Sequence, residues 1–341
     1  MGYNAIMSGA VEITGTQLTN ALRALDVNFI MGGQSTSETL HKQPARLIAA
    51  LAESNESRLR LSLIPLFLEH HEFALHVRTA ARRLDPTARL TLQFYYTAAV
   101  WLGKKYQQHE SLPDYFSGEL GLRPVEDLDE NLRALAKRHR DLSGTWVNWL
   151  GTYLHAATVW QKGLQYKGTE IVDNSEIKSL LQRLGERVPP GSQLILIGGG
   201  ALALLGSPRL TIDIDFVGDD VHPSEFHRFI MQIAKELRID VEPVPLDRFV
   251  PLPTGSTERQ IHIGQFGNLE IYVADPYSIA LSKLDRGFDT DFEDIIFLIR
   301  QNLVSLNELE RITRDALPRA REYDFHPDIL DHLKELKNRI G

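Results

Sequence analysis

Two aspartates, Asp213 and Asp215, are separated by one residue in a segment where apolar and polar residues strictly alternate. Apolar and polar residues follow one another there, in the order Leu210, Thr211, Ile212, Asp213, Ile214, Asp215 and Phe216. This alternation predicts a strand with one apolar face, on which both carboxylates point to the other side. Their charges repel, and a divalent metal ion with oxygen ligands would relieve that repulsion. The pair therefore predicts a metal site.

A run of three glycines, Gly198 to Gly200, precedes the acidic pair. It follows an apolar segment, residues 194–197, that has the length of a buried strand, and the small residues after it can begin a helix. Backbone N–H groups at Gly199 and Gly200 can approach a phosphate because no side chain obstructs them. The run fits neither the dinucleotide fingerprint nor the phosphate-binding P-loop, because their further residues are missing.

The order of strand, glycine pair, helix, turn and Asp-x-Asp strand resembles the nucleotidyltransferase fold of the DNA polymerase β superfamily. Arg209, Thr211 and Asp213-Ile214-Asp215 resemble in particular the AbiEii-type branch, which contains many toxin–antitoxin components. The resemblance covers roughly residues 175–301, the size of one domain. The N-terminal half of the chain lies outside it.

The resemblance implies an enzyme that moves a nucleoside monophosphate from an NTP to an RNA, a protein or a small molecule. Its cofactor would be Mg²⁺, with Mn²⁺ as the alternative, and its partner a cognate toxin or antitoxin. It assigns catalysis and metal binding to Asp213, Asp215 and a third carboxylate on a later strand. It assigns nucleotide binding to the residues Gly199, Gly200, Arg209, Thr211 and Lys283.

Glu270 is the best positional match for the third carboxylate, although aspartate is commoner there in the resembled fold. It shares one face of the predicted strand 269–273 with Tyr272, while apolar residues occupy the other face. The alternative is a glutamate that only faces solvent. Lys283 follows this strand on a predicted helix, residues 277–284, where relatives place a lysine near the nucleotide. Its alternative role is a solvated helix lysine.

The rest of the pattern predicts an α+β protein in two parts. Residues 1–166 read as a helical domain of unassigned role, with helices at 11–28, 45–52, 58–68, 72–83, 88–106, 128–140 and 145–164. Residues 174–341 read as the nucleotidyltransferase-like domain, a small mixed sheet flanked by helices and followed by C-terminal helices. Its remaining strands are expected at 240–244 and 259–263, and its later helices at 174–184, 223–237, 292–302, 306–316 and 327–339.

Composition limits the function classes. The 341 residues contain no cysteine, which excludes disulfides and cysteine-based zinc sites and agrees with a reducing cytoplasm. The sequence predicts neither a secretory signal nor a membrane span, so we expect a cytoplasmic protein without a membrane partner. Residues 1–170 carry 18 basic and 17 acidic residues, whereas the remainder carries 19 and 28. If RNA or DNA binds, the N-terminal half is the expected contact.

Two other function classes compete with the transferase. In one, the nucleotidyltransferase fold is an inactive or weakly active scaffold and the helical N-terminal half binds a partner. In the other, the Asp-x-Asp belongs to a glycosyltransferase. That class requires a larger doubly wound domain before the acidic pair, which the helical N-terminal half does not supply. The sequence identifies neither the acceptor nor the oligomeric state.

Overall fold

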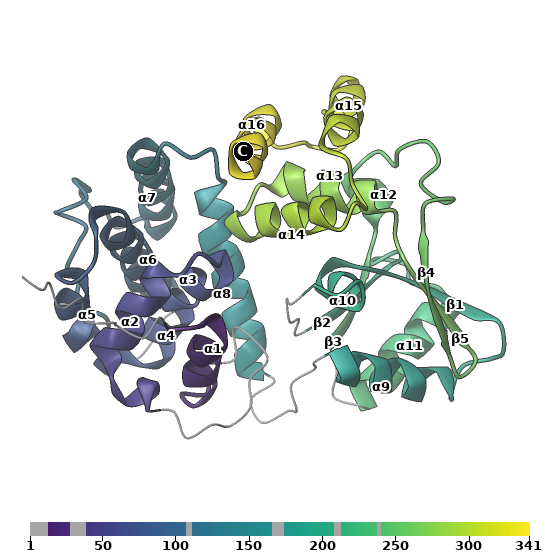
Figure 1. The fold of residues 1–341 in the computed structure, drawn as a ribbon, viewed down its shortest axis with the longest axis horizontal. Coiled ribbons are helices and arrows are strands. Elements are labelled where there is room, and N and C mark those ends of the chain that lie inside the picture. Colours follow the sequence, from purple (N-terminus) through teal and green to yellow (C-terminus); the bar gives the residue numbers. More distant parts are fainter. Residues whose placement is uncertain (1–12, 28–38, 107–110, 166–173, 208–212, 237–239) are drawn as a thin grey trace, which may run out of the picture.

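The computed structural model describes residues 13–27, 39–106, 111–165, 174–207, 213–236 and 240–341. An α+β architecture results, with N-terminal helices, a five-stranded mixed sheet and C-terminal helices (Figure 1). The predicted fold class is confirmed. The expected domain boundary at residues 167–173 lies outside the described residues.

The N-terminal half consists of helices. They are α1 (Gly15–Arg23), α2 (Pro44–Glu53), α3 (Ser57–Leu61), α4 (Leu63–Glu69), α5 (Ala74–Ala81), α6 (Pro86–Lys105), α7 (Leu128–Ser143) and α8 (Trp149–Gln165), with short 3₁₀ turns at Leu40–Lys42 and His71–Phe73. Side-chain caps fix several starts: Thr14 forms a capping box with Gln17, and Asp85 and Asp127 accept hydrogen bonds from the first turns of α6 and α7.

Helix α8 begins four residues later than the predicted helix at 145–164. Helix α7 ends at Gly144, whose φ of +68° turns the chain, and the segment that follows is not helical. Trp146 lies in that segment and is 38% exposed, with the Arg140 guanidinium over its ring. Trp149 and Tyr153 are buried in the core.

The sheet has the strand order β3-β2-β1-β5-β4. Its strands are β1 (Ser192–Ile197), β2 (Asp213–Val217), β3 (Asp240–Val244), β4 (Ile261–Phe266) and β5 (Leu269–Val273). Strand β1 pairs antiparallel with β2 and parallel with β5, whereas β3 is parallel to β2. The short helix α10 (Gly198–Leu204) leaves the end of β1 and packs against β2.

Helices cover one face of this sheet. Helix α9 (Asn174–Gly185) packs against β4 and β5, and α11 (Glu225–Glu236) packs against β3, so both lie on the same side (Figure 1). Beneath them the strand residues are apolar and buried: Leu194, Leu196, Ile214, Phe216, Val241, Leu269, Ile271 and Val273. Phe229 of α11 lies outside this core and is 40% exposed.

The last helices connect the sheet to the N-terminal half. They are α12 (Leu246–Phe249), α13 (Pro276–Arg286), α14 (Asp289–Arg300), α15 (Leu306–Ala316) and α16 (Ile329–Ile340). Helices α13 and α14 lie on the side of the sheet opposite α9 and α11, and α14 also contacts α3 and α8 (Figure 1). In the described part of the chain, no helix combines the length and the hydropathy that crossing a membrane requires.

Candidate functional site

The sheet face that α9 and α11 leave uncovered is polar. Because side chains alternate along a strand, the residues between the buried ones share this second face. They include Gln193, Asp215, Glu242, Glu270 and Tyr272, all of them partly or fully exposed. Buried apolar residues on one face thus fix the direction of the functional side chains on the other.

Strands β2 and β3 pair acidic positions with one another, and of these residues Asp215 and Glu242 lie on this face. Their parallel register matches Asp213 with Asp240 and Asp215 with Glu242. Paired residues of neighbouring strands share a face, and the strands lie about 4.8 Å apart. The sequence analysis predicted the strand at 240–244 but missed its acidic residues. The signal was present, because Asp240-Val241-Glu242 repeats the acidic, apolar, acidic alternation of Asp213-Ile214-Asp215.

Gly198 lies directly beside Asp215. Its φ of +69° belongs to the left-handed region, and a Cβ added there would lie 2.2 Å from Asp215 Oδ2. The position therefore requires glycine for two reasons, backbone conformation and space. Gly199 and Gly200, the pair singled out in the sequence, are buried in the first turn of α10. The structure adds Gly198 to the predicted site.

Two cations from other helices reach the acidic face. Lys162 of α8 lies with its Nζ 2.9 Å from Glu242 Oε1, so the N-terminal half contributes a side chain here. Arg286, at the end of α13, is the second. Burial lowers its pKa, but the negative charges of Asp291, Asp294 and Asp215 outweigh this effect and raise it. Its side chain is 47% exposed, which leaves part of the guanidinium accessible.

Glu270 lies at the other end of the sheet. Asp215 pairs with Ile197 at the last residue of β1, whereas Glu270 pairs with Gln193 near the first. Four residues of strand span about 13 Å, and β2 and β5 flank β1 on opposite sides. Metal–oxygen bonds are about 2 Å long. The register therefore does not bring Glu270 to Asp215, and its predicted role as third carboxylate disagrees with the register. Its carboxylate instead accepts hydrogen bonds from Gln193 and Tyr272.

Lys283 is buried in an ion-pair network. Its Nζ lies 3.1 Å from Asp291 Oδ1 and 2.5 Å from Asp294 Oδ2, and its side chain is 4% exposed. Asp291 also binds Arg286 at 2.6 Å, and Asp294 binds Arg58 of α3 at 2.8 Å. The charges of Arg286 and Lys283 outweigh the effect of burial and hold the pKa of Asp291 below its usual value. Lys283 therefore does not present its ammonium group to a ligand.

The structure describes the remaining predicted site residues only in part. Arg209 and Thr211 lie outside the described residues, and for Asp213 and Asp240 the backbone position alone is described. Among the side chains that are described, no three His, Asp or Glu residues converge on a common metal position. Asp213 and Asp240 are not among those side chains.

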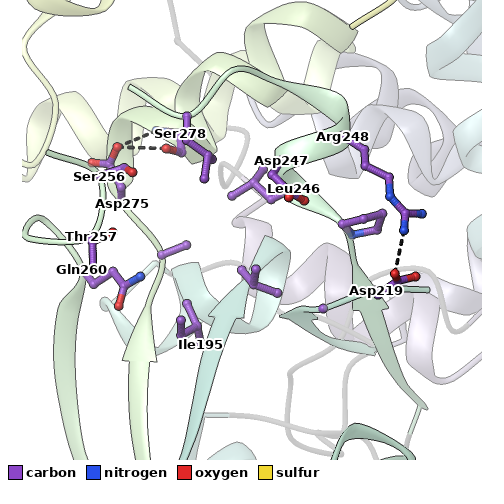
Figure 2. A pocket seen from close by; sticks show the side chains of 15 residues that line it. Ile195, Asp219, Leu246, Asp247, Arg248, Ser256, Thr257, Gln260, Asp275 and Ser278 are labelled. Atoms are coloured by element: carbon purple, nitrogen blue, oxygen red, sulfur yellow. Dashed lines mark hydrogen bonds and ion pairs between the residues drawn. The ribbon is translucent and has the colours of Figure 1, made fainter. Parts of the chain in front are cut away.

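A pocket of about 340 Å³ lies on the same side of the sheet as Asp215 (Figure 2). Ile195 of β1 and Val217 of β2 face it from the sheet, and both alternate in phase with Asp215. The segment from Pro245 to Gln260 and the start of α13 complete its wall. The sequence analysis did not predict this pocket, because its lining comes from segments that are distant in the chain.

A comparison with known protein families supports the fold of the C-terminal half. Residues 175–326 match the model of a family described as a nucleotidyltransferase of unknown function, DUF6036. The match supports the nucleotidyltransferase fold for this part of the chain and does not single out the AbiEii-type branch. No curated protein matches the chain, and no solved structure does.

Proposed function

We propose that the protein is a metal-dependent nucleotidyltransferase that moves a nucleoside monophosphate from an NTP to an acceptor hydroxyl. The observation that carries the proposal is the register of β2 and β3, which pairs Asp215 with Glu242 and Asp213 with Asp240. The close approach of Gly198 to Asp215 supports a role for the glycine run beside this carboxylate. The family match over residues 175–326 supports the same reaction class.

The residues of this face fit magnesium. Carboxylate oxygens are the ligands that Mg²⁺ prefers, and a chain without cysteine offers no thiolate for a softer metal. Asp213 and Asp215 would hold the ion, with Asp240 or Glu242 in the place predicted for Glu270. When bound, Mg²⁺ or Mn²⁺ would neutralise phosphate charge and lower the pKa of the attacking hydroxyl.

The protein groups would bind and orient the NTP. Gly199 and Gly200 would offer backbone N–H groups to the triphosphate, and Arg209 and Thr211 are further proposed contacts. Arg286 would provide the phosphate-binding cation, because it is half exposed and interacts with Asp215. Lys283 would then act as a positioning residue, since it holds Asp291, which in turn binds Arg286.

The cellular role is proposed on the resemblance to the AbiEii-type branch alone. A toxin–antitoxin component would modify an RNA or a protein and would bind a cognate toxin or antitoxin. One observation favours the second candidate function, a binding module with little or no catalytic activity. The lysine that the resemblance assigns to the nucleotide is buried between two aspartates and does not present its ammonium group to a phosphate.

Calorimetry with each NTP, with and without Mg²⁺, separates the two candidates. An active transferase is expected to bind at least one NTP in a metal-dependent way, and the double variant Asp213→Ala, Asp215→Ala is expected to lose that binding. The matched pair Glu242→Gln and Glu270→Gln tests the register, because only the first substitution should weaken metal-dependent binding. If the intact protein binds no NTP with metal present, the transferase proposal fails.

A further inference from the structure

The pocket beside Asp215 has no role in the proposal above. Its volume of about 340 Å³ falls at the lower end of the range for small-molecule sites, about 300–1,000 Å³. Its wall combines three segments: the sheet, the chain from Pro245 to Gln260, and the start of α13 (Figure 2). A pocket of this size suits a small molecule or one ring of a larger ligand.

Its position suits the second substrate of a transferase. Val217 lines the pocket and stands two residues beyond Asp215 on the same face of β2. Two residues of strand span about 7 Å. A molecule in the pocket can therefore place one hydroxyl beside the acidic face while its remaining atoms stay inside the pocket.

The pocket offers apolar contact on one side and unused hydrogen-bonding groups on the other. Ile195, Val217 and Leu246 are apolar, and Figure 2 shows Thr257 and Gln260 on the opposite wall from Asp247. Within the described part of the chain, no protein group hydrogen-bonds to the side chains of Thr257 and Gln260. Such groups can bind a ligand without first breaking an internal hydrogen bond.

The deeper polar groups already have protein partners. Asp275 binds Arg259, at 2.8 Å and 2.9 Å. It also accepts a hydrogen bond of 2.9 Å from the Ser278 hydroxyl (Figure 2). These contacts fix the start of α13. The more exposed groups of the lining, such as Asp247 and Thr257, are therefore the ones left to contact a ligand.

The described residues that line the pocket carry net negative charge, because Asp219, Asp247 and Asp275 outnumber Arg248. Arg248 lies 2.7 Å from Asp219 and 2.9 Å from Asp220, which is outside the lining. Hydrogen bonds from the His222 and Val221 backbone lower the pKa of Asp219, with Arg248 adding to the effect, so this carboxylate stays ionised. Asp247 adds a further exposed carboxylate. A phosphorylated ligand would be repelled, whereas an amine would be attracted.

We propose that this pocket is the acceptor site and that it binds a small hydroxylated ring compound carrying an amine, such as an amino sugar. This inference rests on the proposed transferase function. The acceptor hydroxyl oxygen would form a bond to the α-phosphorus of the NTP, and the bond from that phosphorus to the bridging oxygen would break. Pyrophosphate would leave with that bonding electron pair, and the hydroxyl proton would pass to solvent.

A charge series on one ring tests the ligand class. Glucosamine, glucose and glucosamine 6-phosphate differ mainly in charge, and their binding to the full chain can be measured by saturation-transfer NMR. We expect glucosamine to bind best and the phosphate to bind worst. Asp247→Asn should weaken glucosamine binding about twofold to fivefold, the range of an exposed ion pair, and leave glucose binding unchanged.

A filled pocket tests the location. Thr257→Trp places a large side chain at the exposed rim and should abolish glucosamine binding, while the control Thr16→Trp, exposed on α1, should not. The NTP affinity measured by calorimetry should stay unchanged in both variants. The inference is overturned if glucosamine fails to bind, if Thr257→Trp leaves its binding intact, or if a short RNA binds the pocket instead.

The same measurements separate this inference from the transferase proposal. If Thr257→Trp weakens NTP binding as strongly as glucosamine binding, the pocket holds the nucleoside and the acceptor assignment is wrong. If no NTP binds while glucosamine still binds in a pocket-dependent way, the transferase proposal fails but the ligand class stands.

Discussion

Asp213-Ile214-Asp215 and Asp289-Thr290-Asp291 have the same spacing but different surroundings. The first pair lies on strand β2, where residues two apart share a face. The second lies in the first turn of α14, where residues two apart point in different directions. Asp289 accordingly binds Arg60 and Arg339, whereas Asp291 binds Lys283 and Arg286.

The difference shows what decides between a structural and a functional carboxylate. The α14 aspartates are buried, and cations from α3, α13 and α16 compensate their charges, so they hold helices together. Asp215 is only partly buried and lies on an open face beside other acidic residues. We propose metal binding at Asp215 and not at the α14 aspartates, because acidic residues of two neighbouring strands are paired there.

Replacement of Asp289 should have the largest effect on stability. Asp289→Ala leaves Arg60 and Arg339 without their carboxylate, and losing one partner of a buried pair costs about 3–5 kcal/mol. The free energy of unfolding can be measured in denaturant through the fluorescence of the four tryptophans. Asp315→Ala is the control, because Asp315 is 63% exposed in its pair with Arg311 and should cost under about 1 kcal/mol. Equal losses would remove the distinction between the two kinds of carboxylate.

Lys283→Met should lower the free energy of unfolding by about 2–3 kcal/mol, since two buried aspartates lose one of their cations. Lys334→Met, at a 68% exposed lysine paired with Asp331, is the control. A direct phosphate contact predicts another result: NTP binding would be lost while stability stayed unchanged. Calorimetry and denaturant unfolding on the same samples distinguish the two roles.

Two glycines with similar backbone angles provide a matched pair. Gly198 and Gly191 have φ values of +69° and +78°, but an added Cβ would touch Asp215 in the first case and open space in the second. The left-handed conformation alone costs about 1–2 kcal/mol in either alanine variant. Gly198→Ala should cost more and should also reduce metal-dependent NTP binding. Unimpaired binding would show that the position of Asp215 against Gly198 is not required.

Replacement of Asp285 should have the smallest effect on the free energy of unfolding, and this effect depends on pH. Burial raises the pKa of Asp285 to about 6, above the ordinary value of 3.8. The folded state therefore holds a proton that the unfolded state has lost, and stability declines as the pH rises from about 4 to above 6. Asp285→Asn removes this loss and can still accept the hydrogen bond from the His326 backbone.

A pKa of about 6 against 3.8 corresponds to about 3 kcal/mol, and solvent screening at this partly exposed carboxyl reduces the expected advantage of the variant at pH 8 to about 1 kcal/mol. The difference should shrink towards pH 4, where both residues are neutral. Unfolding measurements at the two pH values provide the check. An advantage that is the same at both pH values would mean that the titration of Asp285 has no part in it.

Local sequence patterns predicted the individual strands better than they predicted which strands lie side by side in the sheet. The alternation in 240–244 and 269–273 predicted β3 and β5 with their observed bounds. It did not show that β3, and not β5, lies beside β2, because strand order depends on how helices cross the sheet. The resemblance assigns the third carboxylate to Glu270 by position along the chain, and the acidic residues of β3 escape prediction. Likewise, helical spacing could not distinguish Lys283 in a buried ion pair from a lysine in solvent.

The chain from Pro245 to Gln260 connects β3 to β4, the two opposite edges of the sheet, and forms one wall of the pocket. It contributes no residue to the β1–β2–β3 pairing that places Asp213 and Asp215. Insertions and substitutions in this connection can therefore reshape the pocket while the acidic face keeps its geometry. In the proposed transferase, evolution could in this way change the acceptor without rebuilding the acidic face.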